Sequence, residues 1–354
     1  MRSQEGAHWT IGRAGSLLAL LALVVAAPAA TAVADKPVPG GQAHYRQSYA
    51  LHSTRGALGM RVSTLPVLAT FAPKTQFPEG LAIDRSGSLY VSVTTWGKTE
   101  KDPNTGRVWR ITPAGKKTAF GPNLQLGGGL LTGVAVDARN RVYVAHATYD
   151  NATPPGVWRI GRGAASRLVN LRVGGFPNGL AFHGGALYVS DSALGAIWRV
   201  KSAGSASLWK RDSLLAPGKR GLGANGIVFS RNHLYVTVTD AGRIVGIPVA
   251  TSGSAGKPVT VVRSKKLVGA DGITVDTRGT LYVVSDLSNL LLRLPVGGTL
   301  EQLATRTSGL LYPTSLAFGR LGTDENLLHI VNGDYFGKET PNLVSFDVAA
   351  LPES

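Results

Sequence analysis

The chain contains no cysteine, which excludes disulfide bonds as a source of stability. Its 354 residues must therefore be held together by packing, and a hydrophobic fraction of 44% is enough to build a core in a chain of this size. Acidic residues are also scarce, since 21 Asp and Glu face 37 Lys and Arg for a net charge of +16. That balance predicts attraction to anionic surfaces.

Long hydrophobic runs are missing beyond the amino-terminal region. The one such run, residues 17–27, is shorter than the roughly 20 residues that span a bilayer. Two arginines precede it, Pro28 follows it, and Ala32-Val33-Ala34 has the small-x-small pattern of a cleavage site. These features predict a signal peptide over 1–34 and a secreted or extracytoplasmic protein with no membrane insertion after cleavage. An uncleaved amino-terminal anchor is the alternative.

Several well-known functional motifs are absent as well. The sequence has no Gly-x-Ser-x-Gly nucleophile elbow, no phosphate-binding glycine loop and no zinc-type spacing of Cys and His. Its basic residues are mostly single and scattered, without the interleaved aromatics of a nucleic-acid motif. We therefore expect a solvated basic surface, no nucleic-acid partner, and at most weak association with anionic polymers of the cell envelope.

An internal repeat dominates the remainder of the chain. Phrases such as "EGLAIDRSGSLYVSV", "NGLAFHGGALYVSD" and "DGITVDTRGTLYVVS" recur six times. Each copy has one anchor residue at the same place, and the six anchors are Glu79, Thr132, Asn178, Asn225, Asp271 and Thr314. Their successive spacings of 53, 46, 47, 46 and 43 residues match one four-stranded propeller blade rather than a helical repeat.

The repeat predicts an all-β fold, a six-bladed β-propeller with four-stranded blades that start near the anchors. The last copy has only three evident strands, so the stretch "LPVLATFAP" before the first copy is expected to supply the missing outer strand and close the ring. Residues 35–64 are then an irregular lead-in, and 65–350 form a single propeller domain. Because a closed ring needs no partner, a monomer is expected.

Two other sets of residues recur with the blades. Trp109, Trp158 and Trp198 share a position on the third strand and are predicted to pack between blades rather than to hold a ligand. Asp191, Asp240 and Asp286 follow the second strand, where an aspartate is expected to cap the turn.

The anchors are predicted to meet at the central channel, because the loop entering each innermost strand of a propeller opens there. All six side chains carry oxygen donors, which is the chemistry preferred by a hard cation such as Ca²⁺. The glycine after an anchor is expected to permit a sharp turn and close approach of the backbone to the channel. Asn-Gly and Asp-Gly are also ordinary turn dipeptides, but Glu79 is not a turn former and has no such local explanation.

A family resemblance follows from four of these anchors. Glu79, Asn178, Asn225 and Asp271, each followed by Gly, resemble the pattern of the senescence-marker-protein, gluconolactonase and luciferin-regenerating-enzyme family. The pattern is also similar to that of paraoxonase and diisopropylfluorophosphatase propellers. The resemblance implies that these four residues bind one divalent metal, usually Ca²⁺, and that Asp271 takes part in hydrolysis as a general base or a nucleophile.

Two functions remain open from the sequence. One is an exported, metal-dependent hydrolase of small lactones or esters, in which His146 is a weaker candidate for proton transfer. The stretch "GGFPNGLAF" lacks the Arg and Asn-Asp-Gly that gluconolactonases tend to use for sugar contacts, so a sugar lactone is not the expected substrate. The alternative is a non-catalytic, NHL-like binding propeller with a structural ion or water site in its channel.

Overall fold

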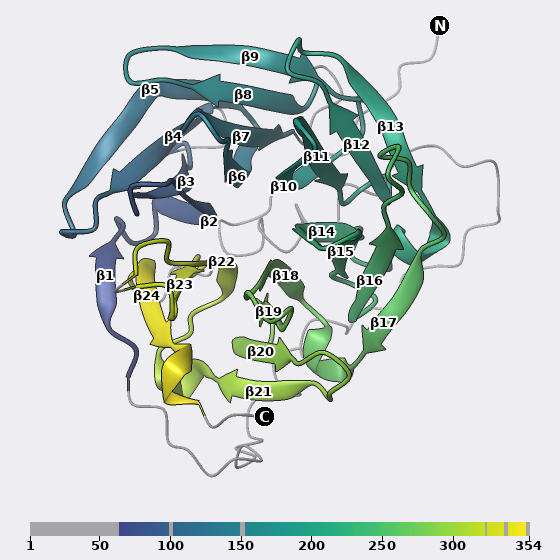
Figure 1. Cartoon of the computed structure of the whole chain (residues 1–354). Helices are drawn as coiled ribbons and strands as arrows, with labels where there is room; N and C mark the ends of the chain where they lie inside the picture. Colours follow the sequence, from purple (N-terminus) through teal and green to yellow (C-terminus); the bar gives the residue numbers. More distant parts are fainter. Residues whose placement is uncertain (1–63, 99–101, 149–152, 323, 336–338, 352–354) are drawn as a thin grey trace, which may run out of the picture.

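Six four-stranded antiparallel sheets surround a central axis in the computed structural model, which describes residues 64–98, 102–148, 153–322, 324–335 and 339–351 (Figure 1). The predicted six-bladed β-propeller is confirmed. The predicted signal peptide and nearly all of the predicted lead-in lie outside the described residues. Within the described part of the chain, no helix is long and apolar enough to cross a membrane.

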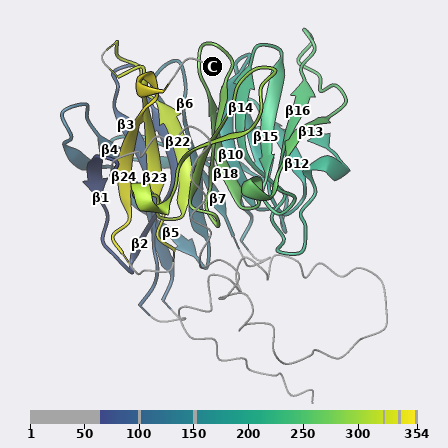
Figure 2. The same ribbon diagram turned by 90° about the horizontal axis from the view of Figure 1, so that it is seen from below.

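Each blade runs from an inner strand at the axis to an outer strand at the rim (Figures 1 and 2). The inner strands are β2 (Gln76–Ile83), β6 (Leu130–Val136), β10 (Pro177–His183), β14 (Ala224–Ser230), β18 (Ala270–Val275) and β22 (Pro313–Phe318). The second strands are β3 (Leu89–Thr95), β7 (Val142–Ala147), β11 (Ala186–Asp191), β15 (His233–Val238), β19 (Leu281–Ser285) and β23 (Leu327–Asn332).

The outer half of each blade is formed by its third and fourth strands. The third strands are β4 (Asn104–Ile111), β8 (Gly156–Ile160), β12 (Ala196–Val200), β16 (Arg243–Pro248), β20 (Leu290–Leu294) and β24 (Asn342–Asp347). The fourth strands are β5 (Lys117–Gly127), β9 (Ala165–Asn170), β13 (Ala206–Arg211), β17 (Val259–Arg263), β21 (Glu301–Ala304) and β1 (Val67–Thr70). Short 3₁₀ turns are η1 (Ser213–Leu215), η2 (Lys265–Leu267), η3 (Arg306–Ser308) and η4 (Val348–Ala350).

The ring is closed by the first strand of the described chain. Strand β1 pairs antiparallel with β24, and the sixth sheet has the order β1-β24-β23-β22. The register places Val67 opposite Val344 and Thr70 opposite Asn342. The predicted closure by the "LPVLATFAP" stretch is therefore confirmed, and the ends of the propeller are held together by strand pairing.

The hydrophobic core lies in layers between adjacent blades, as expected when both faces of an antiparallel sheet are covered. Tyr90 of β3, for example, is buried in one cluster with Val134 and Val144 of the second blade. Trp158 packs against that same cluster, Trp109 against the cluster shared by the sixth and first blades, and Trp198 against the one shared by the second and third blades. The prediction that these tryptophans pack between blades is confirmed.

Every inner strand carries a bulge at its anchor residue. In β2 the register shifts between Pro78 and Leu81, so that Glu79 and Gly80 have no regular partner on β3. Equivalent shifts occur in the other five inner strands. The anchors thus lie within the strands and not in the loops that enter them, which corrects our expectation. An extra residue of this kind bends a strand and redirects its side chains.

The glycines after the anchors are required by the neighbouring blade. A Cβ on Gly133 would lie 2.3 Å from the main-chain oxygen of Asn178, and one on Gly226 would lie 2.3 Å from that of Asp271. Such contacts are too close for a real side chain, so these inner strands approach one another at glycine; in the sixth blade Ser315 stands at this place, and its hydroxyl accepts from the Leu81 amide at 3.2 Å. The expectation that these glycines serve a turn or the channel contents is replaced by this packing reason.

Candidate metal site in the central channel

The four anchors that the sequence selected as ligands are all buried at the inner strands. Glu79 comes from β2, Asn178 from β10, Asn225 from β14 and Asp271 from β18. Their main chain is tied to other blades: Thr314 Oγ1 donates to the Glu79 carbonyl at 2.7 Å. Thr237 Oγ1 similarly donates to the Asp271 carbonyl at 2.6 Å. Ser190 Oγ donates in the same way to the Asn225 carbonyl. Because the four anchors are bulged and buried, and the carbonyls of three accept bonds from other blades, their positions depend on the ring as a whole.

The two threonine anchors have a different role. Thr132 Oγ1 donates to the carbonyl of Pro177 in the third blade at 2.8 Å, while Thr314 bonds to the first blade. Their hydroxyl protons are therefore used to join neighbouring blades. What remains in the ring is two carboxylates and two amides, the same four residues that the resemblance implied.

Two oxygen atoms of this set are buried without a hydrogen-bond partner among the described residues, namely Glu79 Oε2 and Asn225 Oδ1. The Asn225 amide nitrogen donates to Thr239 Oγ1 at 3.0 Å, which leaves its oxygen for another contact. An unsatisfied buried acceptor costs free energy. Carboxylate and amide oxygens are the ligands of Ca²⁺, so the residues present fit a hard divalent cation.

The electrostatics of the channel agree with that fit. Burial, together with the charge of Asp286, raises the pKa of Glu79 to about 8. Burial also raises the pKa of Asp271 well above its usual range, with contributions from Glu79 and Asp286 and an opposing hydrogen bond from Asn225. Carboxylates held together away from water repel each other, and a bound cation would relieve this repulsion.

Asp286 is the channel residue that the sequence analysis missed. It was grouped with Asp191 and Asp240, but the three stand at different distances after the tyrosine of the second strand. Asp191 follows Tyr188 by three residues, Asp240 follows Tyr235 by five, and Asp286 follows Tyr282 by four. Position four is occupied by Ser192 in the third blade and Thr239 in the fourth, and these hydroxyls contact the anchors Asn178 and Asn225. Counting from the tyrosine would have found this difference.

The predicted turn cap is seen at Asp191, whereas Asp240 has a structural role of another kind, accepting from the amides of Arg220 and Leu222 before β14. Asp191 accepts hydrogen bonds from the amides of Phe176 and Leu194, and Asp240 forms an ion pair with Arg220. For Asp286 the capping prediction is incomplete. It accepts a hydrogen bond from the Leu287 amide, but its charge also acts on both Glu79 and Asp271. Burial raises the pKa of Asp286 itself to about 7.

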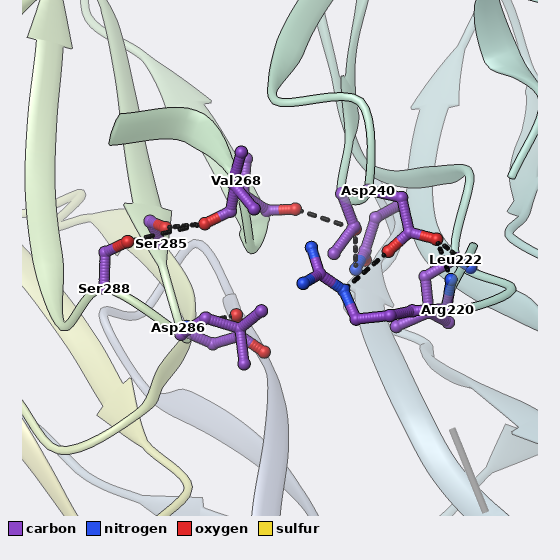
Figure 3. Close-up of polar contacts among 11 residues, drawn as sticks. Arg220, Leu222, Asp240, Val268, Ser285, Asp286 and Ser288 are labelled. Carbon is purple, nitrogen blue, oxygen red and sulfur yellow. Dashed lines mark hydrogen bonds and ion pairs between the residues drawn. The ribbon is translucent and has the colours of Figure 1, made fainter. Parts of the chain in front are cut away.

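One arginine faces this group of carboxylates. Arg220 Nε donates to Asp240 Oδ1 at 3.1 Å, and the end of its guanidinium points toward the side where Asp286 lies (Figure 3). The positive charge of Arg220 lowers the pKa of Asp286, against the effect of burial. Arg220 is thus ion-paired with Asp240, while its positive charge also acts on Asp286.

His146 is not an anchor; it lies on β7, opposite Leu131 of the inner strand β6. Its Nδ1 lies 3.4 Å from Nη1 of Arg167, which belongs to the outer strand β9 of the same blade. Its catalytic role stays a prediction. In the described ranges, no three His, Cys, Asp or Glu side chains converge closely enough to share one metal ion, so a site at the ring depends on the two asparagines.

Aromatic side chains lie beside the first-blade anchor. Phe77, two residues before Glu79, stacks on Tyr335 with ring centroids 6.4 Å apart and contacts the edge of Trp96 at 5.9 Å. Tyr335 comes from the connection after β23, so this group combines the first and last blades. This aromatic group provides an apolar surface next to the carboxylate of Glu79.

Comparison with known proteins gives the fold and no family by sequence. No family model and no curated protein matches the sequence. Among solved structures, a gluconolactonase from Xanthomonas campestris superimposes with a TM-score of 0.57 at 20% identity, over 83% of this chain and 94% of that one. This chain has the six-bladed propeller fold of that protein.

Two further structures are similar to the chain. Regucalcin from Agrobacterium tumefaciens, described as a calcium-binding protein, gives a TM-score of 0.56 at 19% identity, covering 77% of this chain and 87% of that one. Luciferin-regenerating enzyme gives 0.56 at 15% identity, with 77% and 92% covered. The structural neighbours are those of the family that the anchors resembled, and at these identities they establish the fold alone.

Proposed function

We propose that the protein is a metal-dependent hydrolase of lactones or related esters, with one divalent cation, Ca²⁺ by preference, in its channel. The observation that carries the proposal is the pair of buried, unpartnered oxygens on Glu79 and Asn225 within a ring that also contains Asn178 and Asp271. The presence of a gluconolactonase and a calcium-binding protein among the structural neighbours supports it.

The chemistry divides between the cation and the residues of the chain. When bound, a divalent cation supplies Lewis acidity that polarises the carbonyl or phosphoryl oxygen of a substrate. Glu79 balances the positive charge, and the two asparagines orient the site without adding charge. Asp271, held by the Asn225 amide, either removes the proton from the attacking water or attacks the substrate itself.

The surroundings of the ring favour a small and partly apolar substrate. Phe77, Trp96 and Tyr335 place aromatic surface beside Glu79. The third blade lacks the sugar-contact residues of gluconolactonases, so simple lactones, aryl esters and phosphotriesters are better candidates than sugar lactones. From the amino-terminal sequence we further propose that the protein is cleaved near Asp35 and acts outside the cytoplasm. From the closed ring we propose that it is a monomer.

Calorimetric titration tests the metal site directly. Ca²⁺ is titrated into the mature protein after removal of metal by a chelator, beside Glu79→Gln and Asp271→Asn. One-site binding that both variants lose is the expected result, and turnover of the three substrate classes is then measured. Asp276→Asn is the matched control, because Asp276 lies in the turn after β18, where it accepts amide hydrogen bonds from Arg278 and Thr280. Binding that is absent, or equal in all variants, would contradict the proposal.

A non-catalytic binding propeller is the second candidate, and one observation favours it. A cavity of about 430 Å³ lies between the first two blades, lined by residues such as Asp84, Arg110 and Asn140, away from the anchors. A protein that binds Ca²⁺ at the ring but turns over none of the three substrate classes would support this alternative, with the ion serving stability.

A further inference from the structure

Asp286 occupies the strand position that, in the third and fourth blades, links an anchor to the next blade. The equivalent residues of the third and fourth blades, Ser192 and Thr239, have hydroxyl groups that accept from their anchor asparagines at 3.4 and 3.0 Å. These hydroxyls also donate to the carbonyl just before the next anchor, at 2.7 Å to Ala224 and 2.9 Å to Ala270. In the fifth blade this neutral link is replaced by a carboxylate.

The backbone around Asp286 leaves it little freedom to turn away. A Cβ on Gly269 would lie 2.5 Å from Asp286 Oδ1, and the amide of Asp286 donates to the Gly269 carbonyl at 2.9 Å. The side chain is half-buried against this segment, which immediately precedes β18 and Asp271. A carboxyl group is therefore fixed close to the ring.

Arg220 provides the opposing charge. Its side chain is 29% exposed, whereas that of its partner Asp240 is 3% exposed. Two amides, those of Arg220 and Leu222, also donate to Asp240, at 2.8 and 3.2 Å. Asp240 is consequently fixed by the main chain, and the guanidinium is directed from it toward Asp286 (Figure 3).

We propose that Asp286 and Arg220 form an opposed pair of charges that sets how tightly the channel holds its cation, with Asp286 strengthening binding and Arg220 weakening it. This inference rests on the proposed metal site. Neither residue belongs to the four proposed ligands, and in the part of the chain that the structure describes no three acidic or histidine groups are close enough to share an ion. They act through their electric field, which reaches beyond contact distance where water is largely excluded.

The two members of the pair are expected to have opposite effects on Ca²⁺ affinity. Removing the charge of Asp286 takes an attractive charge away from the cation. Removing the charge of Arg220 takes a repulsive charge away and leaves Asp240, which is still bound by two amides, as additional negative charge. A merely structural role for either residue would weaken binding in both variants.

The experiment is calorimetric titration of Ca²⁺ into chelator-treated protein at low ionic strength. Asp286→Asn should bind about tenfold more weakly than the wild type, and Arg220→Gln should bind several-fold more tightly. Asp276→Asn and Arg278→Gln, which make the same charge changes at the turn that follows β18, should stay within about twofold of the wild type. Added salt should reduce both effects.

The outcomes separate this inference from the proposed function. Binding that Glu79→Gln abolishes but that Asp286→Asn and Arg220→Gln leave unchanged would overturn the charge pair and keep the metal site. Weaker binding in both would also overturn it. If the wild type binds no Ca²⁺, both proposals fail. Should Asp286→Asn not fold, judged by circular dichroism, Asp286→Ser introduces the residue that the third blade has at this position and gives the same readout.

Discussion

The hydroxyl of Thr314 donates to the main-chain oxygen of Glu79 at 2.7 Å, although the two residues lie 235 positions apart. This bond joins the last blade to the first at the residue that we propose as the main charged ligand. The strand pairing of β1 with β24 closes the rim of the same blade. The contacts that close the ring thus also hold Glu79 in the candidate site.

A valine at position 314 should test this link. Thr314→Val keeps the shape but removes the hydroxyl, which should cost about 1–2 kcal/mol of stability and weaken Ca²⁺ binding as Glu79 loosens. Thr148→Val is the control, since it removes a hydroxyl bond of 2.8 Å to the Thr153 carbonyl of the same blade and none to an anchor or to a residue beside one. We expect the two variants to have similar free energies of unfolding in denaturant. Calcium binding should be weaker only in Thr314→Val. Equal calcium affinities would show that closure and site are independent.

The stability of the metal-free protein should fall as the pH rises. The folded pKa is about 8 for Glu79 and about 7 for Asp286, against ordinary values of 4.5 and 3.8. The folded state therefore holds protons that the unfolded chain has released, and this contribution is complete below about pH 4 and is lost as the pH passes through 7 and 8. Thermal melting in chelator should give a lower Tm at pH 8.5 than at pH 5.5.

Calcium should remove most of this pH dependence, because a bound cation favours the ionised carboxylates. Repeating the melts with excess Ca²⁺ should raise the Tm more at pH 8.5 than at pH 5.5. A metal-free Tm that rises with pH across this window would contradict the assignment of three mutually repelling carboxylates to the channel.

Alanine at position 226 should be poorly tolerated. The new Cβ would lie 2.3 Å from the Asp271 carbonyl, so Gly226→Ala should lose about 2–4 kcal/mol of stability and displace that ligand. Gly163→Ala is the control, because nothing lies within 4 Å of its added Cβ. Urea unfolding of both variants measures the difference. Equal stabilities would mean that adjacent inner strands are less tightly packed than described.

His146→Gln distinguishes packing from catalysis. Because His146 is buried beside Arg167 rather than in the ring, the variant should lose about 1–3 kcal/mol of stability while its calcium affinity stays unchanged. Once a substrate is known, kcat should fall by less than tenfold at saturating calcium. A fall of a hundredfold or more in a folded variant would instead support its role in proton transfer.

The fold was predictable because its signals are local and repeated. A glycine, a short apolar strand, a polar turn and Leu/Val-Tyr-Val recur at nearly constant spacing, and each repeat specifies one sheet. The three strands of the last copy even indicated which segment had to close the ring. The anchors were found in the same way, because they occupy one position of the repeat. Glu79 and Asp271 stand out there because they are its only carboxylates.

The details of the site were less accessible. The roles of Thr132 and Thr314 as links between blades, and the packing reason for glycines such as Gly226, depend on how closely neighbouring inner strands approach. Asp286 resembled Asp191 and Asp240 by its place after a strand. A shift of one or two residues, which changes the direction of a strand side chain, separates their roles.

The sequence by itself thus determined the blades, their number and the six oxygen-bearing anchors, because strand pairing and turns depend on neighbours along the chain. Only the tertiary structure decided which hydroxyls join blades, which oxygens stay unsatisfied, and that the charge of Asp286 acts on Glu79 and Asp271. Those properties arise from charges and backbone groups on different blades, whose distance is set when β1 meets β24 and the ring closes.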